Sequence, residues 1–240
     1  MPRKSTPTRA VSAGGLTRRG GGRTGNEFAV RSAIVAAARS MNALGINQGT
    51  SGNVSVRWED GLLVTPSGVP YAQMEADDIV HLYMDGGYDH DLAPSSEWRF
   101  HRDILQARPE LGAVVHAHPT YCTAFAICGM EVPAIHYMIA AAGGPTVRCA
   151  GYAPYGTAEL SQLALDALEG RTCCLLANHG MIAAGPNLDK ALWLAVELEA
   201  LCRQYAVALQ VGKPMVLPDE EIARTVERFK AYGPRPKQGA

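Results

Sequence analysis

Two apolar segments joined by a short turn, at residues 53–65, constrain the fold of this chain more than any other feature. Val54, Val56 and Trp58 alternate with polar residues, which is the period of a half-buried strand. The turn at residues 59–61 follows, and residues 62–65 form a second apolar run that ends at Pro66. Strands connected this tightly pair in an antiparallel manner. The chain therefore contains a sheet with at least one hairpin, and an all-helical fold is excluded.

Helical and strand-like patterns alternate along the rest of the chain. Helices are predicted over residues 26–44, 95–107, 157–168, 188–211 and 220–229, with another beginning near residue 120. Further strands are predicted over residues 77–83, 111–118 and 172–177, and residues 135–144 are an apolar segment of small residues. This mixture of helices and hairpin strands predicts an α/β or α+β fold.

Charge is distributed unevenly along the 240 residues. Six of the 22 basic residues and none of the 23 acidic residues lie in residues 1–25, so residues 26–240 carry 16 basic against 23 acidic residues, a net charge of −7. We expect residues 1–25 to form a disordered basic arm and residues 26–240 to form a single domain. An acidic body of this kind argues against nucleic acid as the main partner.

The composition indicates a cytoplasmic protein without a membrane partner. Hydrophobic residues make up 47% of the chain, enough for a buried core, but no segment reaches the ~18 consecutive apolar residues of a membrane span. The first residues lack the apolar core of a secretory signal. Six cysteines occur and none forms a C-x-x-C pair, which favours reduced thiols in the cytoplasm.

Three histidines follow apolar runs. His116 and His118 are two positions apart on a predicted strand, so both rings project from one face and can bind one metal ion. A His-x-His pair alone is also common without a metal. His179 ends a second apolar run, beside Gly180, and three histidines at strand ends are typical of an open catalytic zinc site. Spacing alone does not place the two strands together, so the zinc site is a hypothesis.

Polar residues gather at four further points. Glu97 lies at the predicted start of a helix, where a carboxylate either complements the helix dipole or acts as a base or a fourth metal ligand. Residues 49–53, 65–68 and 94–96 are polar turns that offer hydroxyl and backbone N–H groups, and the third precedes a helix. Each is typical of an ordinary turn, but together they can hold a phosphate with neutral donors.

Several motifs, in this order along the chain, resemble the class II aldolases of the aldolase/adducin family, and within it most the L-fuculose-1-phosphate aldolases. The resemblance extends from about Asn26 to Tyr232. The matching segments are residues 47–57 (NQGTSGNVSVR), 65–68 (TPSG), 94–101 (PSSEWRFH), 114–118 (VVHAH), 133–144 (PAIHYMIAAAGG), 178–180 (NHG) and 191–195 (ALWLA). It implies a three-layer αβα fold, with a central, mostly antiparallel sheet covered by helices on both faces, and a homotetramer with active sites between subunits.

The resemblance also implies an activity and roles for individual residues. A zinc ion, or another divalent ion such as Mn²⁺ or Co²⁺, would act as a Lewis acid during reversible cleavage of a ketose 1-phosphate. The products would be dihydroxyacetone phosphate and an aldehyde such as L-lactaldehyde. The metal ligands would be His116, His118 and His179, with Glu97 as acid/base group and as a ligand when substrate is absent. The phosphate pocket would comprise Thr50, Gly52, Asn53, Ser67, Gly68, Ser95 and Ser96. Tyr137 would reach a site across a subunit boundary, and Phe229 and Tyr232 would close over it.

Other activities are compatible with the same motifs. A 5-deoxyribulose or 5-methylthioribulose 1-phosphate aldolase would share the ketose 1-phosphate half of the substrate and differ in the aldehyde. A pentulose 5-phosphate 4-epimerase would use the same metal and bond cleavage, and a methylthioribulose-phosphate dehydratase ranks lower. A non-enzymatic, adducin-like interaction module would be favoured by loss of the histidines, but all three are present.

Overall fold

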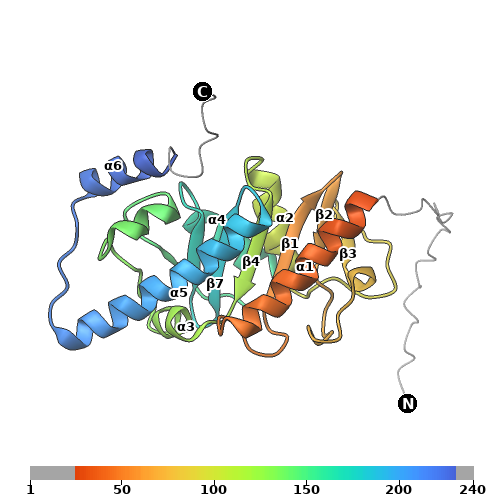
Figure 1. Ribbon diagram of the computed structural model, residues 1–240, viewed down its shortest axis with the longest axis horizontal. Helices are drawn as coiled ribbons and strands as arrows, with labels where there is room; N and C mark the ends of the chain where they lie inside the picture. The colour runs from red at the N-terminus through yellow and green to blue at the C-terminus, as the bar shows by residue number, and fades with distance from the viewer. Residues whose placement is uncertain (1–24, 231–240) are drawn as a thin grey trace, which may run out of the picture.

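A seven-stranded sheet forms the centre of the molecule in the computed structural model, which describes residues 25–230 (Figure 1). The strand order is β3-β2-β1-β4-β7-β6-β5. The strands are β1 (Asn53–Trp58), β2 (Gly61–Val64), β3 (Val80–Tyr83), β4 (Ala113–Ala117), β5 (Cys149–Ala150), β6 (Cys173–Leu176) and β7 (Gly180–Gly185). All neighbouring strands pair antiparallel except β5, which pairs with β6 in parallel. The hairpin expected at residues 53–65 is β1–β2.

Helices cover both faces of this sheet, which confirms the predicted three-layer fold. The helices are α1 (Gly25–Ala43), α2 (Trp98–Ala107), α3 (Thr120–Ile127), α4 (Ala158–Ala167), α5 (Leu188–Val211) and α6 (Asp219–Lys230), with short 3₁₀ helices η1 (Ala76–Asp78) and η2 (Tyr137–Ala142). In Figure 1, α1 and α5 cross in front of the strands. The apolar side chains of α1, α3 and α5 form one buried cluster with the sheet, and those of α2 and α4 form a second cluster on its other face.

Alternation along the strands explains the two clusters. Val114 faces the α2–α4 side, whereas its neighbour Val115 faces the α1–α5 side. Cys173 and Cys174 likewise belong to opposite clusters, as expected for adjacent strand residues, and all six cysteines are free. Within residues 25–230, the structure contains no helix that is both long and apolar enough to cross a membrane.

The pairing of β1, β4 and β7 brings distant residues to one edge of the sheet. Asn53 at the start of β1 pairs with His116 near the end of β4, and His116 pairs with Ile182 of β7. The β6–β7 turn carries His179 to the same edge. Three segments that are far apart in sequence therefore meet where β4 ends.

Several predicted elements differ in detail. The strand expected at residues 77–83 is the 3₁₀ helix η1 followed by β3, and the small-residue segment at 135–144 contains the 3₁₀ helix η2. The helix expected from residue 95 begins at Trp98, with Glu97 as its N-cap residue. The predicted basic arm lies outside the described residues except for Gly25, and Tyr232 also lies outside them.

Candidate metal centre and active site

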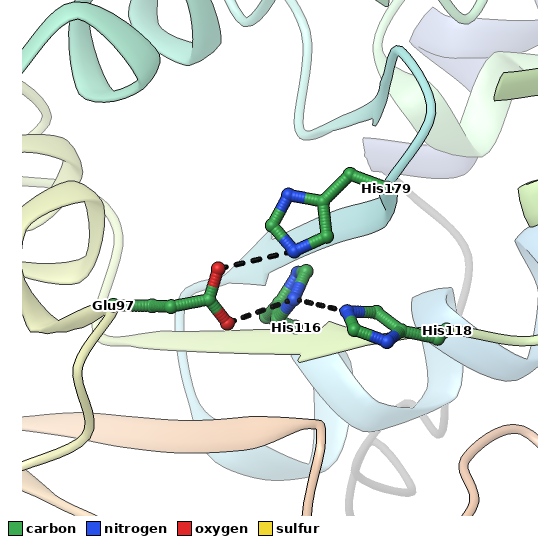
Figure 2. Close-up of side chains that lie close together, drawn as sticks. All are labelled: Glu97, His116, His118 and His179. Atoms are coloured by element: carbon green, nitrogen blue, oxygen red, sulfur yellow. Dashed lines mark hydrogen bonds and ion pairs between the residues drawn. The ribbon is translucent and has the colours of Figure 1, made fainter. Parts of the chain in front are cut away.

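Three imidazoles and one carboxylate converge at the end of β4 (Figure 2). His116 Nε2 lies 2.9 Å from His118 Nε2 and 3.2 Å from Glu97 Oε2, and His179 Nε2 lies 3.1 Å from Glu97 Oε1. One ligand atom from each of the four residues lies within 4.8 Å of the other three. His179 lies in the turn that leads into β7, the neighbour of β4, a placement that the spacing in sequence could not establish.

Each of the four side chains is held by a different local structure. His116 is in β4, and His118 follows the last residue of that strand, just before Pro119 and α3. His179 follows Asn178, which adopts a left-handed conformation (φ 55°) in the β6–β7 turn. Glu97 precedes the first turn of α2, where its side chain makes no capping hydrogen bond and remains directed at the histidines.

Gly180 makes room for this arrangement. A Cβ atom at this position would lie 2.5 Å from the carbonyl oxygen of Ala117 and 2.6 Å from Cδ2 of His118. Both distances are shorter than any ordinary contact, so β7 approaches the end of β4 this closely only with glycine here. The space that Gly180 leaves open is occupied by Ala117 and His118.

The donor set fits a divalent metal ion. His116 Nδ1 donates a hydrogen bond to the carbonyl oxygen of Met181 at 2.8 Å, which leaves the lone pair of Nε2 directed at the cluster. Glu97 Oε1 is buried, and within residues 25–230 its contact is with His179 Nε2, 3.1 Å away. Imidazole nitrogens and carboxylate oxygens are common ligands of Zn²⁺ in proteins.

The protonation states also suit a metal. Burial, together with the nearby His116 and His179, lowers the pKa of His118 to about 3, so this ring is neutral near pH 7. Burial alone would raise the pKa of Glu97, but His116 and His179 outweigh it and hold that pKa well below its ordinary value. A neutral imidazole and an ionised carboxylate are the forms that bind metal ions.

A cavity of about 380 Å³ opens beside the cluster. Two polar turns that line it are hydrogen-bonded together, because Ser95 N donates to Thr65 O at 2.9 Å and Ser67 N donates to Ala93 O at 3.0 Å. Within the part of the chain that the structure describes, no lysine or arginine lines this cavity. The predicted site residues that line it are Thr50, Gly52, Asn53, Ser67, Gly68, Ser95, Ser96, Glu97, His118 and His179.

The turn at residues 49–53 requires glycine at position 52. A Cβ atom on Gly52 would lie 2.7 Å from both the carbonyl oxygen of His116 and Oδ1 of Asn47. The buried hydroxyl of Tyr71 donates a hydrogen bond to the carbonyl oxygen of Gly52 from the other side. The turn therefore packs directly on β4 at His116.

A buried set of polar side chains lies behind Glu97. Asn53 Nδ2 donates a hydrogen bond to Glu97 Oε2 at 3.0 Å, and Asn53 Oδ1 lies 2.5 Å from His101 Nε2. His101 Nδ1 lies 2.7 Å from the hydroxyl oxygen of Ser55. Neither His101 nor Ser55 was identified from sequence. A signal for His101 was available, because residues four apart near the start of a helix, such as Glu97 and His101, share one face.

Two predicted aromatic site residues do not line this cavity. Tyr137 is 52% exposed on η2 and its ring centroid lies 6.5 Å from that of Phe229 on α6. Neither residue lines the cavity of its own chain. The third predicted aromatic residue, Tyr232, lies outside residues 25–230.

Two aromatic residues of the cavity were missed from sequence. Tyr152 and Tyr155 lie between β5 and α4, line the cavity and are 64% and 70% exposed. The sequence signal available for them was two tyrosines in a loop just before Thr157, the N-cap residue of α4. Ser51, Pro66, Ala153 and Asn178 complete the lining.

The chain is similar to known proteins over most of its length. The family described as Class II Aldolase and Adducin N-terminal domain matches residues 32–206. A 5-methylthioribulose-1-phosphate/5-deoxyribulose-1-phosphate aldolase of Rhodospirillum rubrum is 51% identical over 209 residues, which is 87% of this chain and 95% of the relative. An L-fuculose phosphate aldolase of Escherichia coli K12 is 50% identical over 203 residues, 84% of this chain and 94% of the relative.

The similarity extends to three dimensions. A solved structure of an L-fuculose 1-phosphate aldolase superposes with a TM-score of 0.82 at 39% sequence identity, and the match covers 84% of this chain and 96% of that one. At this level of identity and coverage, the two chains share one fold.

Proposed function

The chain belongs to the class II aldolase and adducin family, and on that premise we propose that it is a lyase that reversibly cleaves a ketose 1-phosphate. The products are dihydroxyacetone phosphate and an aldehyde. One observation carries the proposal: three imidazoles and one carboxylate meet beside a cavity whose polar turns present hydroxyl and amide groups. An adducin-like interaction module has no use for such a buried set of ligands.

Two substrate classes have equal support. L-Fuculose 1-phosphate would release L-lactaldehyde, whereas 5-methylthioribulose or 5-deoxyribulose 1-phosphate would release a less polar aldehyde. Relatives named for each class are 50% and 51% identical to this chain. The substrates share the ketose 1-phosphate half, so discrimination belongs to whatever contacts the aldehyde, and the exposed rings of Tyr152 and Tyr155 are candidates for that contact.

His116, His118, His179 and Glu97 would hold the metal ion, and zinc is the ion that this donor set favours. When bound there, such an ion supplies Lewis-acid stabilisation of negative charge that develops on the dihydroxyacetone phosphate half. Mn²⁺ and Co²⁺ accept the same donor types and are alternatives. A metal-dependent reaction needs no lysine Schiff base, in keeping with the lack of lysine in the cavity lining among the described residues.

The polar turns would bind the phosphate. Thr50, Asn53, Ser67, Ser95 and Ser96 offer hydroxyl and amide donors, and the backbone N–H groups before α2 favour an anion. Gly68 leaves the backbone of its turn open, because a Cβ atom there would meet nothing within 4 Å, whereas Gly52 allows its turn to pack against β4. Binding the phosphate away from the broken bond orients the substrate for reaction.

Glu97 would transfer protons in the reaction. Its carboxylate lies at the junction of the three histidines and the cavity, and its lowered pKa keeps it in the ionised form that a base requires. Glu97 would serve as a metal ligand when substrate is absent and as the acid/base group when substrate is bound, as the family resemblance implies. The side-chain amide of Asn53 donates a hydrogen bond through Nδ2 to Glu97 Oε2 and would keep the carboxylate oriented.

The active form would be a homotetramer in which each cavity is completed by a neighbour. Tyr137 would act on the aldehyde oxygen of a neighbouring site, with Phe229 and Tyr232 closing over it. Support comes from the position of Tyr137 outside the cavity of its own chain and from exposed apolar side chains along α5, namely Trp193, Val207, Leu209 and Val211. The free thiols support a reducing, cytoplasmic location.

A coupled assay tests this function. Zinc-loaded protein is given each candidate ketose 1-phosphate, and dihydroxyacetone phosphate is measured with and without a chelator. We expect release that the chelator abolishes, and the ratio of kcat/KM values identifies the aldehyde preference. Glu97→Gln should lower kcat by about 10²–10⁴-fold, the usual size of general acid–base catalysis.

The controls separate the alternatives. Arg102→Gln removes a charge from α2 that lies outside the cavity, and it should behave like the unmodified protein. Release of dihydroxyacetone phosphate that the chelator does not affect would contradict the metal-dependent mechanism. Conversion of ribulose 5-phosphate to xylulose 5-phosphate, without any release, would establish the epimerase instead.

A further inference from the structure

His101 is a buried histidine to which the proposed reaction assigns no task. It lies on α2, one turn after Glu97, and its side chain is 0% exposed. Burial, with a contribution from His116, lowers the pKa of His101 to about 3, so the ring is neutral near pH 7. A buried neutral imidazole has one donor and one acceptor nitrogen, and both need partners.

The partners of His101 fix its tautomer. Asn53 Oδ1 can only accept a hydrogen bond, so His101 Nε2, 2.5 Å away, carries the proton. His101 Nδ1 is then the acceptor, and the hydroxyl of Ser55 donates to it at 2.7 Å. The chain of hydrogen bonds runs in one direction, from Ser55 through His101 and Asn53 to the carboxylate of Glu97.

The opposite orientation of the Asn53 amide is unfavourable at the Glu97 end. If the amide were rotated by half a turn, its oxygen would face Glu97 Oε2, and two electron-rich oxygens would meet in a buried site. With its NH₂ group toward Glu97, the amide places Oδ1 against His101, where this buried oxygen needs a donor. The N–H group of His101 supplies that donor and so stabilises the orientation in which Asn53 supports the ionised carboxylate.

We propose that His101 is a positioning residue that holds the Asn53 amide with its NH₂ group toward Glu97, and so sets the direction of the carboxylate that serves the metal centre. This inference rests on the proposed function of Glu97 as metal ligand and base. His101 does not itself line the cavity, and among the described residues it makes no hydrogen bond to any of the three histidines of the cluster. Its effect passes through Asn53 alone.

The test compares two substitutions of His101 in the zinc-loaded, full-length protein. His101→Leu removes both nitrogen atoms at similar volume, whereas His101→Gln retains an N–H donor that can reach Asn53 Oδ1. The main readout is the equilibrium transfer of Zn²⁺ to a chromogenic chelator, with kcat and KM measured beside it. A thermal melt of each variant reports whether it is folded.

We expect His101→Leu to weaken Zn²⁺ binding by about 10–100-fold, the usual effect of removing a partner that supports a metal ligand. His101→Gln should recover most of this loss, and kcat should fall more than KM rises in the leucine variant. His81→Leu, which removes a histidine from β3 on the same sheet, is the matched control and should retain normal Zn²⁺ affinity.

Two results would overturn the inference. Either normal Zn²⁺ affinity in His101→Leu, or equal losses in the leucine and glutamine variants, would show that the donated N–H does not matter. If the leucine variant fails to fold, Ser55→Ala takes its place, because it removes the donor that fixes the tautomer and should weaken Zn²⁺ binding by about threefold. Equal affinity in Ser55→Ala, His101→Gln and the unmodified protein would then reject the inference.

The zinc readout is independent of the substrate. Failure of the unmodified protein to cleave any ketose 1-phosphate, with tight zinc binding that depends on His101, would reject the proposed activity and leave the positioning role intact. Normal cleavage, with zinc binding that does not depend on His101, would reject the positioning role and leave the proposed activity intact.

Discussion

The turn at residues 49–53 packs so closely on β4 that one added atom at Gly52 would disturb the site. Gly52 lies against the backbone of His116, and the carbonyl oxygen of His116 is fixed by its strand. Backbone atoms cannot move aside as the end of a flexible side chain can. One added methyl group at this glycine must therefore displace either the turn or the strand that carries a metal-binding histidine.

Gly52→Ala should consequently lower the free energy of unfolding by about 1–3 kcal/mol and weaken Zn²⁺ binding together with it. Urea unfolding and chelator competition measure the two effects. Gly212→Ala is the control, because a Cβ atom there meets nothing within 4 Å. Equal stability of the two variants would show that the turn relaxes without cost.

The candidate site was predictable from sequence in part. Residue type and spacing identified His116, His118, His179 and Glu97, because a metal needs these donors and a strand or turn presents them. The contact between Asn53 and Glu97 was not predictable from spacing, since it depends on how α2 lies over β1. The tyrosines at 152 and 155 lie in a loop, whose path follows from packing and not from any sequence period.

At the scale of elements, α5 anchors α3, the helix that follows β4. The carboxylate of Glu199 accepts hydrogen bonds from the backbone N–H groups of Tyr121 and Cys122, at 2.9–3.1 Å. These groups are at the start of α3, where a helix has unpaired donors and attracts negative charge. Because α3 begins just after His118 and Pro119, this anchor also fixes the end of β4.

Glu199→Ala should lower the free energy of unfolding by about 1–3 kcal/mol, because it leaves two helix N–H groups without their charged partner. Zn²⁺ affinity should fall as well, since His118 loses its support. Glu197→Ala, two residues earlier on α5, serves as the control in the same unfolding and chelator measurements. A Glu199 variant as stable as the control would assign the anchoring of α3 to its apolar contacts.

Sequence predicted the long and strongly patterned elements well. The helix at residues 188–211 and the β1–β2 hairpin coincide with α5 and with the observed pairing, because each has a clear period or a tight turn. The 3₁₀ helix η2 and the two-residue strand β5 were not predicted. Both are too short to show a period, and tertiary contacts decide their conformation.

At the scale of the whole molecule, burial of neutral histidines makes stability depend on pH. The folded-state pKa of His101 is about 3, against an ordinary value of 6.5 that the unfolded chain regains. Between pH 6.5 and 3 the unfolded chain therefore binds a proton that the folded chain does not, and stability falls as pH falls. His118 acts in the same direction, and above pH 6.5 neither group contributes.

In the presence of a chelator, the free energy of unfolding should fall as pH is lowered from 7 to 5, with about 2 kcal/mol of the loss due to His101. Urea unfolding at the two pH values measures it, and His101→Gln should reduce the difference by about that amount. An unchanged difference in this variant would mean that His101 is already protonated in the folded protein.

The proposed tetramer predicts complementation between inactive variants. Glu97→Gln and Tyr137→Phe remove groups that would serve one site from two different subunits. After the two proteins are mixed and reassembled in equal amounts, about a quarter of the sites should contain both intact residues and be active. Activity no higher than that of either variant alone would place both residues in the same subunit's site.

The positions of the four side chains proposed to hold the metal also determine when, during folding, such a centre would be complete. Glu97 precedes α2, His116 and His118 end β4, and His179 lies in the β6–β7 turn, so the complete set exists only after β4 and β7 have paired and α2 has docked. No short fragment of the nascent chain contains all four. On the proposed function, metal uptake would be a late event that reports completed long-range assembly, and a chain stalled before the β6–β7 turn would lack His179.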